Sequence, residues 1–346
     1  MSCYNPSFIQ RFINPITGEV TTKFLGSVKN CVECNQALKD KYTGFSGSRD
    51  NLNWSNGLKV LDFIMIPCGK CIGCRIDYSR SWADRMTYHS FGKEECSYFI
   101  TVTYDDDHIQ DLDYSKNYDL YSLNPVDFTK FIKDLRNKFR DAQIDYYYSM
   151  EYGDSSFRPH GHFILYNLFI PDLQFWKLDN EGQPIYTSEI IHSLWKKGIC
   201  SISSFAWLNA AYTASYVEKK RDGRANCEYT AVGLVPEGCR MSRRPGISYD
   251  YYIDHYEDLW KNNGLDVSRS VNSSGHLGIP RYFRKLAEEK GIGRKEFVEW
   301  RDRVQEQSLL NNEFKLYNSS FDDNRIIDFL RFQEREILSR KKNKSL

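Results

Sequence analysis

The segment that most constrains the fold is "RPHGHFILY" at residues 158–166, where two of the chain's seven histidines flank a single glycine. The apolar run after the histidines predicts a β-strand. Because alternate side chains of a strand point to the same face, His160 and His162 would share a face, and Gly161 between them has no side chain to crowd them. Two imidazoles on one face suit a metal ion, and a purely structural histidine pair is the alternative interpretation.

A second strand is predicted for "DYYYSMEY" at residues 145–152, because aromatic side chains dominate it. The polar connection "GDSSFRP" that follows allows this strand to fold back beside the histidine strand. Glu151 would then meet His160 and His162, and two imidazoles with one carboxylate suit a divalent cation that keeps open coordination positions. The alternative is a solvent-exposed Glu151 at the end of its strand.

A helix is predicted over residues 206–220, and it contains the segment "YTASYVEK". Tyr212 and Tyr216 are four residues apart and Lys219 follows three residues later, so all three would lie on one face of the helix. A tyrosine phenol can attack a phosphodiester when a metal ion polarises the phosphate, and a lysine can stabilise the charge that develops. An aromatic stripe packed in a core is the alternative, although it would bring the Lys219 ammonium into an apolar environment.

The remaining patterns predict an α+β protein with an antiparallel sheet. The segment "SYFITVTY" at residues 97–104 alternates like a strand. Residues 124–139 form an amphipathic helix with Asn124 as its N-cap, and residues 188–198 form another helix. Helical patterns dominate from Tyr249 to the end of the chain.

These elements suggest three parts. Residues 1–95 are cysteine-rich and irregular, residues 96–245 hold the strands of the candidate site, and residues 246–346 are mainly helical with a basic tail. No run of 18 apolar residues and no signal peptide are visible, so a cytoplasmic protein without a membrane partner is expected.

Six of the ten cysteines lie in the first part of the chain: Cys3, Cys31, Cys34, Cys68, Cys71 and Cys74. The last three are spaced too tightly for chance, and four thiolates would form a structural zinc site. The fourth ligand would be Cys3 or a member of the Cys31–Cys34 pair. The spacing also allows an iron–sulfur cluster, but zinc is favoured because nothing else indicates redox chemistry. Ordinary free thiols are the third interpretation.

The charge of the chain is nearly balanced, with a formal net charge of +1, which does not support a generally basic nucleic-acid coat protein. Local basic stretches stand out, however. Candidate phosphate contacts lie in residues 219–224 and in "SRR" at residues 242–244, namely Lys220, Arg221, Arg243 and Arg244. A solvated surface explains these stretches equally well. The sequence contains no GxxxxGK[ST] loop, so no NTP-driven helicase is expected in the chain itself.

Three segments together resemble the motifs of the HUH endonuclease superfamily of rolling-circle replication initiators: "FITVTY", "RPHGHFIL" and "YTASYVEK". The closer resemblance is to the replication initiation proteins of gokushovirus-type microviruses, which are single-stranded DNA phages. Segments similar to "PCGKCIGCR", "EYG…RPHGH" and "MSRRPGI" occur there in the same order. The resemblance covers roughly residues 1–290.

The resemblance implies an HUH-type central antiparallel sheet flanked by helices and an enzyme that nicks origin DNA through a 5′-phosphotyrosine intermediate. It implies Mg²⁺ or Mn²⁺ at Glu151, His160 and His162, and Tyr212 and Tyr216 as alternating nucleophiles with Lys219 as the motif lysine. Host helicase and replication proteins in the bacterial cytoplasm are the implied partners. Some two-tyrosine relatives have a second lysine where this chain has Ser215, which puts strict alternation in doubt. The competing hypothesis is a zinc-dependent DNA-binding protein that cleaves nothing.

Overall fold

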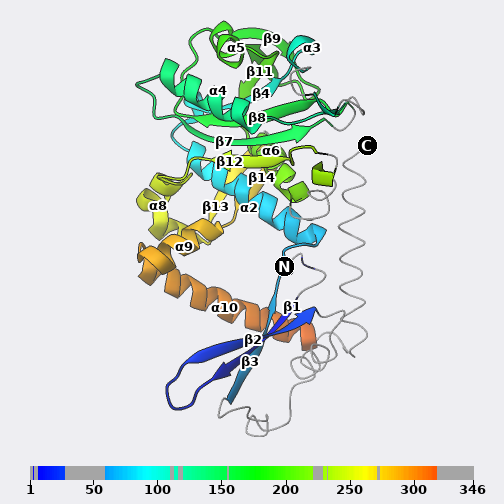
Figure 1. Ribbon diagram of the computed structural model, residues 1–346. Helices are drawn as coiled ribbons and strands as arrows, with labels where there is room; N and C mark the ends of the chain where they lie inside the picture. Colours follow the sequence, from blue (N-terminus) through cyan, green and yellow to red (C-terminus); the bar gives the residue numbers. More distant parts are fainter. Residues whose placement is uncertain are drawn as a thin grey trace. The chain divides into compact units, whose positions relative to one another are not determined.

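The computed structural model of the 346-residue chain is shown in Figure 1. It describes residue 3 and residues 7–27, 59–109, 113–115, 120–153, 156–220, 229–231, 233–270 and 273–317. The chain divides into two compact units, one made of Met1–Asp77 with Arg301–Leu346 and the other of Tyr78–Trp300. The basic tail of the sequence lies outside the described residues.

The first unit contains a three-stranded antiparallel sheet where an irregular segment was expected. Its strands are β1 (Ser7–Ile13), β2 (Val20–Ser27) and β3 (Lys59–Ile66), in the order β2-β1-β3. The strands are rich in Phe, Ile, Val and Thr, which favour extended backbone, so the expectation of irregular structure was wrong for these residues.

The second unit is built on a seven-stranded sheet in which every neighbouring pair is antiparallel. The strand order is β12-β7-β8-β4-β11-β10-β9. In chain order the strands are β4 (Tyr98–Thr103), β7 (Asp145–Tyr152), β8 (Pro159–Tyr166), β9 (Gln174–Leu178), β10 (Pro184–Thr187), β11 (Cys200–Ser204) and β12 (Gly238–Met241). The α+β class and the antiparallel sheet are therefore confirmed.

One face of this sheet is covered by α4 (Pro125–Lys138) and α5 (Glu189–Trp195) (Figure 1). The side chain of Asn124 accepts a hydrogen bond from the Val126 amide, which confirms the expected N-cap. Aromatic side chains from both helices, Phe128 and Trp195 among them, fill the core on this face. The odd-numbered residues of β8, such as Phe163, point into the same core.

The other face is covered by α2 (Ile72–Ser90) and α6 (Trp207–Lys220). Small and flexible side chains of these helices, including Met86, Ala210 and Ala214, pack against Ile164 and Tyr166 of β8. Since alternate residues of a strand share a face, His160 and His162 belong to this second face.

Beyond the sheet, the second unit contains α8 (Tyr249–Asn262), a hairpin of β13 (Leu265–Ser270) and β14 (Ser273–Leu277), α9 (Arg281–Lys290) and the start of α10 (Arg294–Tyr317). The hairpin was not predicted. It begins after Gly264, whose φ of +121° requires glycine and ends the helical path.

Short elements complete the described chain: the 3-10 helix η2 (Glu94–Cys96), α3 (Asp106–Ile109), β5 (Asp113–Ser115) and β6 (Leu120–Tyr121). Among the helices of the described ranges, none has the length and apolar character needed to cross a membrane.

Candidate active site

The register of β7 against β8 assembles two imidazoles and a carboxylate. Glu151 pairs with His160 across the two strands, and Ser149 pairs with His162. The Oε1 atom of Glu151 lies 2.8 Å from Nε2 of His160 and 2.5 Å from Nε2 of His162. The three donor atoms thus converge at one point on the α6 side of the sheet, as the alternation in the sequence predicted.

Gly161 has a different role from the one expected. A Cβ atom at this position would overlap the ring of Phe128, which packs on the opposite face of the sheet. The glycine therefore allows α4 to approach β8 closely, and this approach fixes the strand that carries the two histidines.

Hydrogen bonds to the outer nitrogen atoms orient both imidazoles. Nδ1 of His160 lies 2.9 Å from the Arg158 carbonyl oxygen, which can only accept, so Nδ1 carries hydrogen and the neutral ring presents an Nε2 lone pair to Glu151. Nδ1 of His162 lies 2.9 Å from Oγ1 of Thr101, which permits the same tautomer. This pattern of support is typical of histidines that bind a metal ion through Nε2.

The electrostatics of the cluster combine an anionic oxygen with nitrogen donors. Burial raises the pKa of Glu151, but hydrogen bonds with both histidines outweigh it and hold the pKa below its usual value. Burial lowers the pKa of His162, whereas for His160 the contacts with Glu151 and the Arg158 carbonyl outweigh burial and raise the pKa. One carboxylate and two imidazoles within 4.8 Å of one another form a donor set that fits a divalent cation.

Tyr212 of α6 lies directly beside this cluster. Its ring centroid is 5.0 Å from that of His162 and 6.5 Å from that of Phe99, with the rings close to perpendicular. Ala210 and Ala214 anchor α6 in the core, while the Tyr212 side chain keeps 47% of its surface exposed. A phenol at this position can meet a substrate from solvent, so Tyr212 is not part of a buried aromatic stripe.

Tyr216, Lys219 and Lys220 belong to the helical backbone of α6, but their side chains lie outside the described part of the chain. Tyr216 follows Tyr212 by slightly more than one helical turn, about 6 Å along the axis. Arg221 lies outside the described residues altogether.

Arg243 and Arg244 are described and exposed, but they are not at the cluster. They follow β12, whose register pairs Met241 with Tyr147 and Gly238 with Met150. The two arginines therefore lie near the opposite end of β7 from Glu151.

A second group of metal-binding side chains forms in the first unit, where β3 leads into α2. The sulfur atoms of Cys3, Cys68, Cys71 and Cys74 lie within 4.8 Å of one another, and Cys31 and Cys34 lie outside the described residues. All four are free thiols.

The sulfur spacings fit a tetrahedral ion rather than disulfides. Cys68 and Cys74 are 4.0 Å apart and Cys3 and Cys71 are 3.7 Å apart. Four sulfurs at zinc–thiolate distance would be separated by about 3.8 Å. Burial raises the pKa of Cys74 to about 11, so a bound cation would be needed to hold its thiolate.

Two supporting residues were missed in the sequence. Thr101 contacts His162, and the Phe99 ring stacks on the His162 ring at 5.4 Å with an interplanar angle of 8°. The available signal was the alternation of "FITVTY", which puts both residues on one face of β4, next to β8.

Comparison with known proteins agrees with the position of this site. The model of the ORF2 family of replication-associated proteins matches residues 97–221, a range that contains both histidines, Glu151 and the α6 tyrosines. The chain is 33% identical to the replication-associated protein ORF2 of Spiroplasma virus 4 over 226 residues, which cover 64% of this chain and 68% of that protein.

It is also 32% identical to the replication-associated protein VP4 of Bdellovibrio phage phiMH2K over 197 residues, which cover 55% of this chain and 58% of that protein. No solved structure gives a significant match.

Proposed function

The chain belongs to the ORF2 family of phage replication-associated proteins, and we propose that it is the origin endonuclease and ligase that initiates rolling-circle replication of a single-stranded DNA phage. The observation that supports this proposal best is the half-exposed Tyr212 ring, 5.0 Å from the His162 ring of a carboxylate–imidazole cluster. We assign the endonuclease domain to residues 96–245.

In the proposed reaction, the Tyr212 oxygen attacks a phosphodiester of the origin. The tyrosine–phosphorus bond forms as the bond from phosphorus to the 3′ oxygen breaks, and the phenol loses its proton as the leaving oxygen gains one. The product is a 5′-phosphotyrosine and a free 3′ hydroxyl, which can reverse the step and reseal a strand. Mg²⁺ or Mn²⁺ held by Glu151, His160 and His162 would polarise the phosphate and stabilise its developing charge.

We assign Tyr216 as the second nucleophile and Lys219 as a charge-stabilising residue. Ser215 stands where some relatives have a second lysine, and its hydroxyl donates to the Tyr212 carbonyl oxygen at 2.7 Å. A single lysine would therefore serve both tyrosines. Lys220, Arg221, Arg243 and Arg244 are proposed phosphate contacts.

A covalent-capture assay tests this function. The full chain is incubated with labelled single-stranded origin DNA and Mn²⁺ or Mg²⁺, and the adduct is resolved by denaturing electrophoresis and mass spectrometry. Tyr212→Phe and Tyr216→Phe should each retain partial cleavage, the double variant should have none, and Tyr186→Phe serves as the matched control. Full adduct formation in the double variant would contradict the tyrosine assignment.

The cysteine group favours a second candidate function, a zinc-dependent DNA-binding protein without cleavage. Four clustered thiols with tetrahedral spacing support structural zinc at Cys3, Cys68, Cys71 and Cys74. Tight DNA binding without an adduct in any divalent metal would favour this candidate over the endonuclease. Elemental analysis that finds neither zinc nor iron in the purified protein would remove the cysteine site from both.

The proposed partners follow from the reaction. A nickase opens duplex DNA only when a helicase unwinds it, and this sequence contains no NTP-binding loop, so host helicase and replication proteins in the bacterial cytoplasm are the proposed partners.

A further inference from the structure

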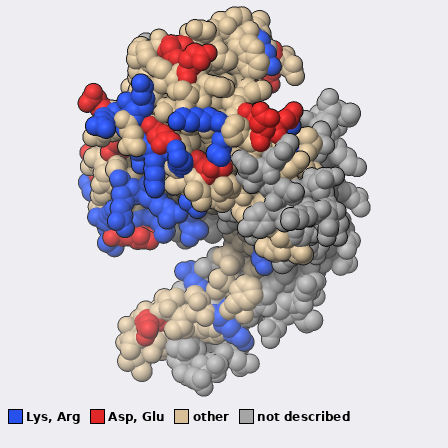
Figure 2. All heavy atoms as spheres, turned by 45° about the horizontal axis from the view of Figure 1, so that its top comes forward, with Lys and Arg blue, Asp and Glu red and all other residues tan. Residues whose placement is uncertain are grey.

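A basic groove lies at the sheet edge formed by β12, on the side where α4 passes. Its lining includes Arg136 of α4, Arg240 of β12, and Arg243 and Arg244 of the following segment, with Asp145 as the carboxylate among them. The groove encloses about 760 Å³, which is within the range of ligand-binding clefts. Basic side chains are distributed unevenly over the described surface (Figure 2).

The positive charge extends along α4. A neighbouring hollow shares Arg240 with the groove and is also lined by Thr129, Lys130 and Lys133. Lys133 and Arg136 are three residues apart, so they lie on the same side of the helix. The two hollows together form a basic track several residues long.

The charges of the arginines are not neutralised within the described chain. Arg136 donates to the Ile144 carbonyl oxygen at 2.7 Å, and Arg240 donates to the Thr129 hydroxyl at 3.1 Å. Both partners are neutral. Asp145 makes its ion pair with His89, 3.2 Å away. An anionic ligand is therefore needed to balance these guanidinium groups.

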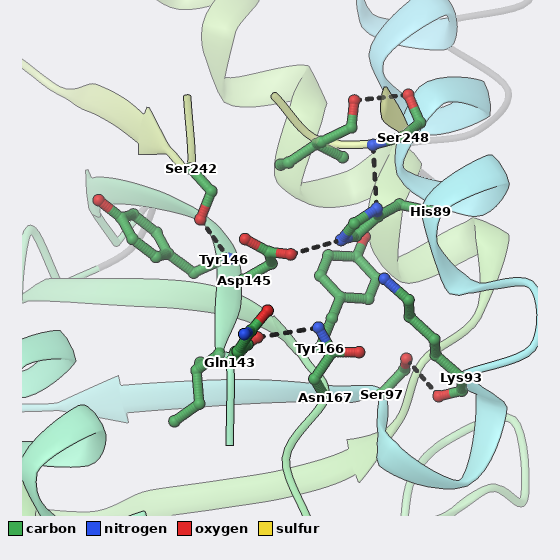
Figure 3. Close-up of polar contacts among 12 residues, drawn as sticks. His89, Lys93, Ser97, Gln143, Asp145, Tyr146, Tyr166, Asn167, Ser242 and Ser248 are labelled. Carbon is green, nitrogen blue, oxygen red and sulfur yellow. Dashed lines mark hydrogen bonds and ion pairs between the residues drawn. The ribbon is translucent and has the colours of Figure 1, made fainter. Parts of the chain in front are cut away.

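The segment from Ser242 to Ser248, which carries the last two arginines, is held at both ends (Figure 3). At its start, the Ser242 hydroxyl accepts from the Tyr146 amide at 3.1 Å, and the Ser242 amide donates to the Tyr146 carbonyl oxygen at 2.9 Å. At its end, the Ser248 amide donates to Nδ1 of His89 at 2.9 Å. The backbone that presents the arginines is thus fixed before any ligand binds, which lowers the entropic cost of binding.

The groove is separate from the metal-binding cluster. Asp145 begins β7 and Glu151 is six residues later, so the two sites are about 20 Å apart along the strand. A nucleic-acid strand rises about 3.4 Å per nucleotide in B-DNA, so this separation corresponds to about six nucleotides.

We propose that this groove binds the phosphate backbone of DNA that flanks the cleavage site, and that it supplies affinity and orientation rather than chemistry. The proposal rests on the DNA-directed function proposed above. Backbone phosphates fit because arginine forms bidentate hydrogen bonds with phosphate and because four arginines arranged along an edge match a linear polyanion.

The test measures binding of fluorescent 40-nucleotide oligo(dT) over a range of salt concentrations. All proteins carry Tyr212→Phe, so that covalent capture contributes nothing. The pairs Arg243→Gln with Arg244→Gln and Arg136→Gln with Arg240→Gln are compared with Arg140→Gln, an exposed arginine that does not line the groove. Circular dichroism melts confirm that each protein is folded.

Each groove pair should reduce the salt dependence by about 1.4 in the slope of log K against log salt, since a phosphate contact on single strands contributes about 0.7. At 0.1 M salt this corresponds to an affinity loss of about 10- to 30-fold, whereas Arg140→Gln should bind like its parent. Slopes and affinities of folded groove variants within twofold of the control, or no binding by the control at low salt, would overturn the proposal. Because no cleavage is measured, a failure of the tyrosine mechanism would not produce either result.

Discussion

Strand β7 carries a histidine–carboxylate contact at each of its ends, and the two contacts leave different nitrogen atoms available. At one end, Nε2 of His89 lies 3.2 Å from Asp145, and Nδ1 accepts a hydrogen bond from the Ser248 amide (Figure 3). Nε2 of neutral His89 must therefore carry the hydrogen and donate it to Asp145. At the other end, Nδ1 of His160 donates to a carbonyl oxygen, so Nε2 keeps its lone pair.

The comparison shows that the backbone group at Nδ1 decides what an imidazole can do. An amide N–H at Nδ1 makes His89 a hydrogen-bond donor that ties two elements together, while a carbonyl at Nδ1 makes His160 a ligand. The number of donors differs as well. Glu151 meets a second imidazole from His162, and within the described residues this cluster and the cysteine group are the sites where three or more donors converge.

The largest expected effect comes from changing the carboxylate to an amide at each end of β7. Glu151→Gln should reduce Mn²⁺ affinity and adduct formation about a thousandfold, or ~4 kcal/mol, because the anionic ligand is lost. Asp145→Asn is the matched control and should leave Mn²⁺ affinity at the wild-type value. Calorimetric titration of Mn²⁺ measures both variants, and equal losses of affinity would break the distinction between the two ends.

A smaller effect is expected from the residue that orients His162. Thr101→Val removes the hydroxyl 2.9 Å from Nδ1, and Mn²⁺ affinity should fall about 10- to 100-fold because the ring is no longer held in the metal-binding tautomer. Thr101→Ser retains the hydroxyl and should restore most of the affinity. A Val variant that binds Mn²⁺ like wild type would show that the β8 backbone alone positions His162.

The carboxylate–imidazole cluster could be predicted from the sequence because it depends on local alternation. The side-chain period of two puts His160 and His162 on one face, and a short connection brings Glu151 opposite them. The contact with Thr101 could not be predicted, because it depends on the register of β4 against β8, two strands about 60 residues apart in sequence. Selecting Cys3 as the partner of Cys68 requires the same kind of long-range information.

The fold was predictable where hydrophobic periodicity is strong. The strand at residues 145–152 and the helix capped by Asn124 appear as expected. The outer strands of the sheet were missed because they are short or lack a buried face. Strand β9 is exposed along its whole length, and β12 has only four residues. Sheet pairing, rather than local propensity, makes such segments extended.

The smallest expected effect is on stability at the Asp145 end of β7. Burial raises the pKa of Asp145, but hydrogen bonds with His89 and Ser242 outweigh it and hold the pKa below its usual value. A carboxyl group with a lowered folded-state pKa stabilises the protein above the unfolded-state value of about 4, and this contribution is lost as the pH falls through the folded-state pKa.

Wild type should therefore exceed Asp145→Asn in unfolding free energy by about 1–2 kcal/mol between pH 5 and 7, because a charged hydrogen bond is replaced by a neutral one. Below pH 4 the two proteins should converge as Asp145 becomes protonated. Thermal melts at several pH values measure the difference, with Asp179→Asn in an exposed turn as the control for a general loss of charge. A wild-type advantage that stays constant down to pH 3 would mean that the contact with His89 stabilises the fold through packing and not through the carboxylate charge.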